Sequence, residues 1–194
     1  MERAIHHTQL LTEILNMRPC AEAVISGVPD NGAPGGAARR PGADIFPGTG
    51  GIPVPSVPAQ TGISGSVRFF ETTAGVLVYA EIRGLPDNRG ECRGDIFGFH
   101  IHEGKECSGT TSDPFADTGP HYNPNNCLHP WHAGDMPPLF GTNGLALSVF
   151  LTNRFNCREI IGRTVVVHAM PDDLSTQPSG GSGAKIACGV IKEI

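Results

Sequence analysis

From residue 63 to the C-terminus, apolar and polar residues alternate in short runs. Side chains on a β-strand point to its two faces in turn, so this period of two predicts strands that are buried on one side. The runs are rich in β-branched and aromatic residues, and turn-forming residues bound them. They cover residues 66–70, 76–82, 97–102, 145–151 and 163–168, and a further alternating run lies at 20–26.

Two stretches between these predicted strands are long and irregular, at residues 103–140 and 169–187. Loops of this length within a compact domain usually carry function. We therefore expect an all-β protein, a sandwich or barrel with two long functional loops.

The first part of the chain has a different pattern. Apolar residues within 2–16 recur at roughly helical spacing, and Pro19 follows, which predicts a short N-terminal helix. These apolar residues are Ile5, Leu10, Leu11, Ile14 and Leu15.

Residues 27–62 have no sustained pattern, and 16 of these 36 residues are Gly or Pro. Such a segment buries too little apolar surface to offset its ordering entropy, which predicts a flexible insertion. A polyproline-type binding segment at residues 52–58 is the alternative. The predicted organisation is a helical extension at 1–17 and a β domain at 18–194, with the insertion at 28–62.

Composition narrows the class of protein. Gly and Pro supply 26 and 17 of the 194 residues, which disfavours a helical bundle. The net charge of −5 argues against a nucleic-acid partner, which needs a basic surface, and no apolar run approaches a membrane span. The N-terminus has no apolar signal segment, so we expect a cytoplasmic protein, or an extracytoplasmic one if a signal was removed before this numbering begins.

Six of the eight histidines fall in three settings that suit metal binding. His100 and His102 sit at alternate positions of one predicted strand, so their rings share a face. Four residues of the first long loop and the last residue of an apolar strand complete the set. These five are His121, His129, His132, Asp135 and His168. Six imidazoles and a carboxylate exceed what one ion needs, which predicts two sites, and nitrogen-rich ligands suit copper or zinc.

Five motifs in order resemble the copper/zinc superoxide dismutase family. They are Gly98-Phe-His-Ile-His-Glu103, Gly119-Pro-His-Tyr-Asn-Pro124, His132-Ala-Gly-Asp135, Ile161-Gly-Arg-Thr-Val-Val-Val-His168 and Ala187-Cys-Gly-Val-Ile191. The resemblance implies a Greek-key β-barrel or sandwich of the immunoglobulin-like type. It also implies an antioxidant oxidoreductase that converts superoxide to oxygen and hydrogen peroxide by redox cycling of copper, with a structural zinc.

Carried over by motif position, the resemblance assigns the metal ligands. Copper would bind His100, His102, His121 and His168, and zinc would bind His121, His129, His132 and Asp135. His121 would then bridge the two ions, release copper on its reduction and carry a proton to the departing peroxide. Asp172 would accept N–H bonds from one ligand of each metal, and Cys107 and Cys188 would form the family's disulfide.

Lys185 stands where the family has an arginine at the rim of the copper channel. It keeps the positive charge but lacks the planar fork, and residues 169–184 contain no lysine, so we expect weaker attraction of superoxide. The resemblance gives Lys185 and His121 the catalytic roles.

Several alternatives stay open at this point. Cys20, Cys92, Cys127 and Cys157 match no family position; Cys92 could pair with Cys157, free thiols are equally compatible, and Cys127 could be a spare soft ligand. A copper- and zinc-binding storage or delivery protein with little catalysis is the alternative function. A homodimer is compatible with the sequence but not specified by it.

Overall fold

The computed structural model describes residues 17–28, 62–86 and 95–194. The predicted N-terminal helix and the Gly/Pro-rich insertion fall almost entirely outside these ranges, and Cys92 falls outside them as well. Among the described residues, helix is limited to a 3-10 turn, η1 (Ala116–Thr118), and one short helix, α2 (Cys157–Ile160).

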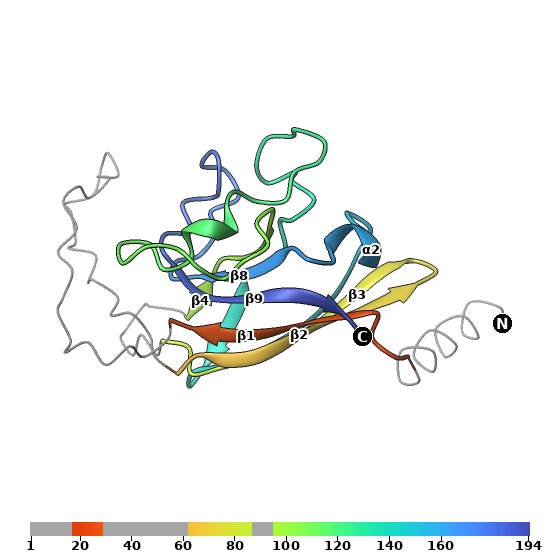
Figure 1. The fold of residues 1–194 in the computed structure, drawn as a ribbon, viewed down its shortest axis with the longest axis horizontal. Coiled ribbons are helices and arrows are strands. Elements are labelled where there is room, and N and C mark those ends of the chain that lie inside the picture. The colour runs from red at the N-terminus through yellow and green to blue at the C-terminus, as the bar shows by residue number, and fades with distance from the viewer. Residues whose placement is uncertain (1–16, 29–61, 87–94) are drawn as a thin grey trace.

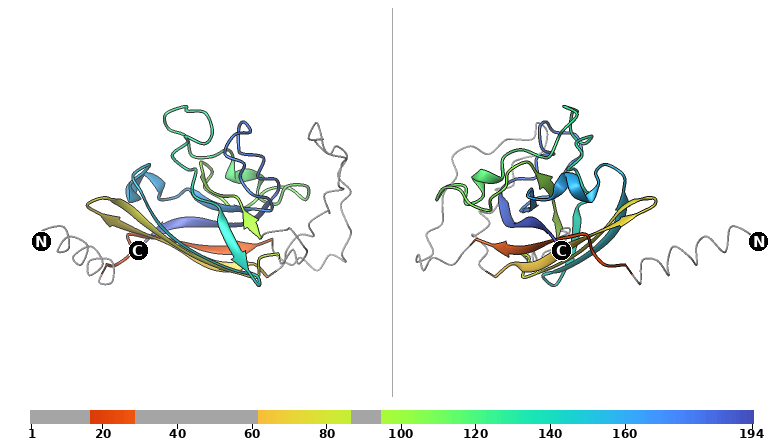
Figure 2. Two further views of the ribbon diagram at one scale, coloured as in Figure 1. Left: turned by 180° about the vertical axis from the view of Figure 1, so that it is seen from behind. Right: turned by 45° about the vertical axis from the view of Figure 1, so that its right-hand side comes forward.

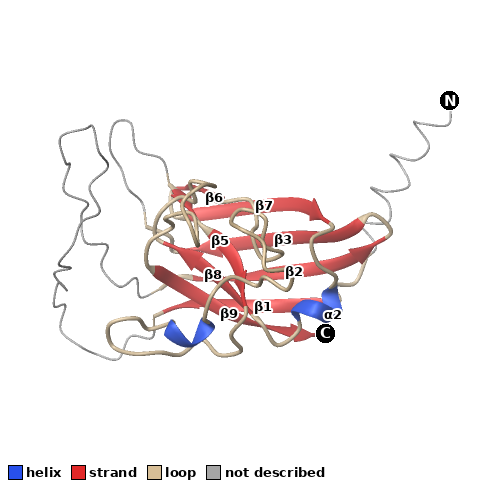
Figure 3. Ribbon diagram, turned by 90° about the horizontal axis from the view of Figure 1, so that it is seen from above, coloured by secondary structure: helices blue, strands red, loops and turns tan. Residues whose placement is uncertain are grey.

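Nine strands make up the rest of the regular structure (Figures 1 and 3). They are β1 (Ala21–Gly27), β2 (Ser64–Thr72), β3 (Gly75–Arg83), β4 (Ile96–Phe97), β5 (Phe99–His102), β6 (Leu139–Thr142), β7 (Leu145–Thr152), β8 (Thr164–His168) and β9 (Lys185–Glu193). All pairs are antiparallel, in the order β4-β6-β7-β3-β2-β1-β9-β8-β5. The all-β prediction is confirmed.

The two ends of this sheet belong to one stretch of chain. β4 pairs with β6 at one end and β5 pairs with β8 at the other, and only Gly98 separates β4 from β5. The stretch 96–102 therefore nearly closes the sheet into a barrel. Because closure removes exposed sheet edges, it explains how so many short strands form one stable unit.

The predicted alternation places the core inside this barrel. On β1, Ala21, Ala23 and Ile25 are buried, whereas Val24 is exposed. Phe69 on β2 and Val78 on β3 face the same core from neighbouring strands. Burying such side chains is the main stabilising contribution, about 1.5–3 kcal/mol for each large aliphatic or aromatic residue.

β5 and β8 depart from alternation, since every residue in both strands is buried. Their inner side chains, such as Phe99 and Ile101, join the barrel core. Their other face is covered by the two long loops, which rise from one side of the barrel (Figures 1 and 2). The sequence therefore supplies histidines where a soluble barrel would normally present side chains to water.

Two strands, β6 and β9, were not predicted from the sequence, and β9 begins at Lys185, inside the second long loop predicted at 169–187. The first long loop was predicted to extend to Phe140, but β6 begins at Leu139 and forms a hairpin with β7. Asn143 and Gly144 at the turn have φ of 51° and 76°, which is typical of the tight turns that join twisted strands. This Asn-Gly pair is the local signal that would have predicted the hairpin.

None of the helices in the described ranges has the length and apolar character needed to cross a membrane.

Candidate metal centre

The outer edge of β5 positions the first loop against the strand histidines. Ile101 donates its backbone N–H to Gly134 O and accepts one from Tyr122 N, at 2.9 and 2.8 Å. These bonds place His121 opposite His102 and Asp135 opposite His100. Gly134 is required here, because a Cβ at this position would overlap the carbonyl oxygen of Ile101.

One cluster of four buried histidines lies over β5 and β8. It consists of His100, His102, His121 and His168. The Nε2 atoms of His102 and His168 lie 3.2 Å apart, and the rings of His100 and His121 are separated by 3.9 Å between centroids. The structure thus brings together all four residues that the sequence analysis expected around copper.

A second cluster lies within the first loop and shares His121 with the first. It consists of His121, His129, His132 and Asp135, all buried. The Asp135 carboxylate lies 2.7 Å from His121 Nδ1, 3.1 Å from His129 Nδ1 and 3.4 Å from His132 Nδ1. All three rings therefore turn the same nitrogen, Nδ1, toward one carboxylate.

The nitrogen geometry fits metal ions better than hydrogen bonding alone. Ligands at about 2.0–2.1 Å from a tetrahedral ion are about 3.3 Å apart. This is close to the 3.2 Å between His102 and His168 Nε2, and to the 3.1 and 3.4 Å between Asp135 and the rings of His129 and His132. Three ring nitrogens, His100 Nδ1, His121 Nε2 and His129 Nδ1, are buried and make no hydrogen bond; His129 Nδ1 faces the Asp135 carboxylate at 3.1 Å as an ion-pair contact only. Orphaned buried polar atoms are unfavourable, and a cation would satisfy all three.

Asp172, from the second long loop, links the two clusters. Its Oδ2 lies 2.8 Å from His100 Nε2 and its Oδ1 lies 2.9 Å from His129 Nε2. Each ring thereby donates its Nε2–H, which faces away from its cluster, to the Asp172 carboxylate and leaves Nδ1 available to bind an ion. Gly180 makes room for this contact, because a Cβ there would overlap the Asp172 carboxylate.

Burial sets the charge state of the rings. Desolvation lowers the pKa of His100 to about 4 and that of His168 to about 3, and holds the pKa of His102 well below its usual range. These imidazoles are neutral near pH 7, which is the form that binds metals. Burial raises the pKa of Asp135, but the hydrogen bond and charge of His121 outweigh it, so the net pKa is lowered and the carboxylate is charged.

Lys185 begins β9, opposite His168 in the β8–β9 ladder. Its Nζ donates to Phe115 O at 3.0 Å and lies 3.6 Å from Asp113 Oδ2. Burial is the main cause of the low pKa of His168, and the Lys185 charge contributes to it. The ammonium is therefore near the four-histidine cluster, but a carboxylate on the loop partly offsets its charge.

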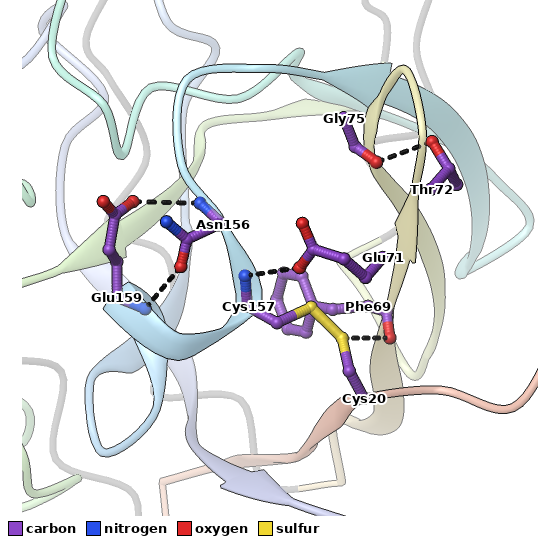
Figure 4. Close-up of a disulfide and its surroundings, with 8 residues drawn as sticks. All are labelled: Cys20, Phe69, Glu71, Thr72, Gly75, Asn156, Cys157 and Glu159. Carbon is purple, nitrogen blue, oxygen red and sulfur yellow. Dashed lines mark hydrogen bonds between the residues drawn. A yellow bond between two sulfur atoms is a disulfide. The ribbon is translucent and has the colours of Figure 1, made fainter.

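Two disulfides are present among the described residues. Cys107–Cys188 joins the first loop to β9, as the family resemblance implied. The second, Cys20–Cys157, joins the start of β1 to α2 (Figure 4). Both alternatives expected for Cys157, a pair with Cys92 and a free thiol, were therefore wrong, and Cys20 is not a free thiol either. Cys20 lies beside Cys157 because both are hydrogen bonded to β2, Cys20 N to Phe69 O and Cys157 N to Glu71 Oε2. Cys127 is an exposed free thiol outside both histidine clusters.

Sequence reasoning missed two side chains that contact the second cluster. Arg154 and Gln177 hydrogen bond to backbone atoms of the loop that carries His129, His132 and Asp135. Contacts to backbone atoms depend on where the chain runs rather than on the partner's residue type. They leave no motif in the sequence.

Comparisons with known proteins agree with this geometry. The family model for copper/zinc superoxide dismutase matches residues 63–191. Superoxide dismutase [Cu-Zn] 2 of Aquifex aeolicus is 33% identical over 145 residues, which is 67% of this chain and 80% of that protein. Superoxide dismutase [Cu-Zn] of Photobacterium leiognathi is 33% identical over 142 residues, 66% of this chain and 78% of that protein.

Solved structures show the same fold. The Cu/Zn superoxide dismutase from Brucella abortus superimposes with a TM-score of 0.60 and 24% identity, over 88% of this chain and 98% of that chain. A double mutant of a SOD-like protein from Bacillus subtilis gives a TM-score of 0.53 at 30% identity, over 65% and 87% of the two chains. Together with the family model, these matches show that the chain belongs to the copper/zinc superoxide dismutase family of oxidoreductases.

Proposed function

We propose that the four-histidine cluster holds the copper of this superoxide dismutase and that the cluster with Asp135 holds its zinc. The observation that carries the assignment is the orientation of His121. Its Nδ1 faces the second cluster, whereas its Nε2 is buried without a partner in the first. If both ions bind, His121 would serve as a ligand in both clusters, with Nδ1 toward the zinc side and Nε2 toward the copper side.

Each residue has a defined part in the reaction of two superoxide anions and two protons to give oxygen and hydrogen peroxide. When bound, copper supplies the one-electron redox chemistry and zinc supplies a fixed positive charge beside His121. His121 Nε2 takes up a proton and donates it to the departing peroxide. Asp172 holds His100 and His129 in the required ring orientation. Lys185 attracts the anionic substrate from beside His168.

The test compares the fully metallated 194-residue chain with its His121→Ala variant. We expect rapid dismutation in a xanthine-oxidase-coupled assay or by pulse radiolysis, and a large loss in the variant. The storage alternative predicts that the parent chain binds both metals stoichiometrically but does not accelerate dismutation. Storage proteins favour soft thiolate ligands, and neither histidine cluster contains one.

We also propose that two copies associate through the outer face of β7. Leu145, Leu147, Val149 and Leu151 point outward from this strand, and Leu147 is 61% exposed. The outward side chains of β7 are uncharged. The flanking charges on β3, Glu81 and Arg83, lie opposite Leu147 and Leu145 and already pair with each other. Leu147→Lys should then produce monomers in analytical ultracentrifugation, whereas a parent that is already monomeric would contradict the proposal.

The second disulfide bears on localisation. Disulfides persist in oxidising compartments and are rare in the reducing cytosol. Cys20–Cys157 therefore supports the extracytoplasmic alternative over the cytoplasmic expectation. Thiol quantification on protein purified under alkylating conditions tests this: two free thiols at Cys20 and Cys157 in native material would favour the cytoplasm.

A further inference from the structure

The metal-binding loop, defined here as residues 119–138, carries the four residues of the second cluster. We propose that Arg154 and Gln177 are positioning residues that hold this loop in its zinc-binding shape. Neither belongs to the ligand cluster. The proposal rests on the assignment of zinc to that cluster, made above.

Arg154 gathers three carbonyl groups of the loop at one nitrogen. Its Nη1 donates to Pro130 O at 2.8 Å, to His132 O at 3.2 Å and to Asp135 O at 3.3 Å. Two of these carbonyls belong to residues of the second cluster. The guanidinium also lies 6.0 Å from the centre of the Trp131 ring. A single cation thus fixes the backbone at both ends of the segment 130–135.

The backbone of Arg154 is itself anchored to the barrel. Phe155, the next residue, is buried against Phe69 of β2 in an edge-to-face contact at 6.2 Å. Cys157 is tied to Cys20, and its N–H donates to Glu71 on β2 (Figure 4). The segment that presents Arg154 is therefore covalently joined to Cys20, the residue before β1, and hydrogen bonded to β2.

A capping box strengthens the same segment. Asn156 Oδ1 accepts from Glu159 N, and Glu159 Oε2 accepts from Asn156 N, at the start of α2 (Figure 4). This reciprocal pair satisfies backbone donors that the four-residue helix would otherwise leave open. Arg154 therefore contacts the loop from a segment whose own structure is fixed independently of the loop.

Gln177 holds the loop from its other side. Its Nε2 donates to His129 O at 2.7 Å, and its Oε1 accepts from His129 N at 3.0 Å. The side-chain amide thereby pairs both backbone groups of one residue of the cluster. Asp172, on the same second loop, binds the ring of His129, so backbone and ring are fixed independently.

Ordering a loop costs conformational entropy, which reduces metal affinity if it occurs on binding. A loop held beforehand by five hydrogen bonds has less to lose when the ion arrives. We therefore expect Arg154 and Gln177 to raise zinc affinity without contributing a ligand. Three of the four copper-cluster histidines, His100, His102 and His168, lie on β5 and β8 rather than on this loop. Copper affinity should therefore change little.

The experiment measures Zn²⁺ affinity by chelator competition in the full chain after metal removal, together with the visible spectrum of bound Co²⁺. Arg154→Met keeps the aliphatic stem but removes the donors, and Gln177→Met removes both amide contacts. Each is expected to weaken Zn²⁺ binding about tenfold and to alter the Co²⁺ bands, since supporting contacts typically change metal affinity by 10–100-fold. Arg154→Lys should recover part of the affinity.

Arg158→Met is the matched control, because Arg158 is also exposed and lies on α2, four residues further along the chain. It should keep the parent affinity and Co²⁺ spectrum. Parent-like Zn²⁺ affinity in both Met variants would overturn the proposal. Equal losses of Zn²⁺ affinity, Cu²⁺ affinity and unfolding temperature of the metal-free chain would also overturn it, as they indicate general destabilisation. If Asp135→Ala likewise leaves Zn²⁺ binding unchanged, the zinc assignment itself is wrong.

Discussion

The two halves of the metal centre are built by different means. Three of the four residues in the copper cluster, His100, His102 and His168, lie on β5 and β8. All four residues of the zinc cluster lie on the metal-binding loop, where the backbone of His121 and Asp135 pairs with β5 only through isolated bridges. One half is therefore positioned by a barrel ladder, and the other by side chains that hold a loop.

This difference determines which substitutions should weaken each metal site. A ladder such as that between β5 and β8 fixes ring positions through backbone bonds that most substitutions leave intact. The loop depends on a few specific groups, namely Asp172, Arg154 and Gln177. Substitutions outside the ligand sets should therefore affect zinc more than copper.

Asp135→Ala is expected to give the largest difference between the loss of zinc binding and the loss of copper binding. The carboxylate is the only anionic member of the zinc cluster, and it contacts all three rings that surround it. Its loss should weaken Zn²⁺ binding by more than 100-fold, beyond the effect of losing a supporting contact. Metal analysis after dialysis should show copper retained and zinc absent. Equal loss of both metals would mean that the two clusters act as one site.

A smaller effect on both halves is expected from Asp172→Asn, because this carboxylate binds His100 and His129 together. An amide oxygen can accept from one ring, but the amide nitrogen must then face the other ring's N–H. Zn²⁺ affinity should fall by about 10–100-fold, and copper affinity by less because β5 still holds His100. Chelator competition measures the affinity for each metal. A greater loss of copper affinity than of zinc affinity would contradict the view that strands hold the copper cluster.

Substitutions of Lys185 test how the copper-cluster side attracts superoxide, and they should change the dismutation rate only a few-fold. Lys185→Arg should raise the dismutation rate, since arginine adds a planar donor fork. Lys185→Ala should lower the rate and flatten its fall with salt, because screening acts on the attraction that was removed. Asp113→Asn should raise the rate slightly, since it removes the carboxylate 3.6 Å from Lys185 Nζ. An alanine variant with the parent rate and salt dependence would exclude Lys185 from guiding superoxide.

The sequence predicted the strand-built half more completely than the supports of the loop-built half. The spacing of His100 and His102 reports a shared strand face directly, because the side-chain period is two. Both ligand clusters followed from family motifs. The contacts of Arg154 and Gln177 could not be predicted from motifs, because their partners are backbone atoms. Nor could the pairing of Cys20 with Cys157, whose 137-residue separation leaves no local pattern.

The smallest effect is expected from replacing the insertion at residues 28–62 with a two-residue Asn-Gly turn, which provides a control for both halves. Gly27 donates its N–H to Ile63 O at 2.8 Å, and Ser26 lies opposite Ser64 in the β1–β2 ladder. The two strand ends are therefore already antiparallel neighbours, the geometry that a tight hairpin turn joins.

Loop-closure entropy grows only slowly with length, about 0.6 kcal/mol for each doubling, so the shortened chain should be as stable as the parent or slightly more stable. We expect an unfolding temperature within a few degrees of the parent and unchanged occupancy of both metals. Selective loss of zinc would show that the insertion is a further support of the metal-binding loop. Loss of copper would show that even the strand-built half depends on a segment outside the barrel ladder.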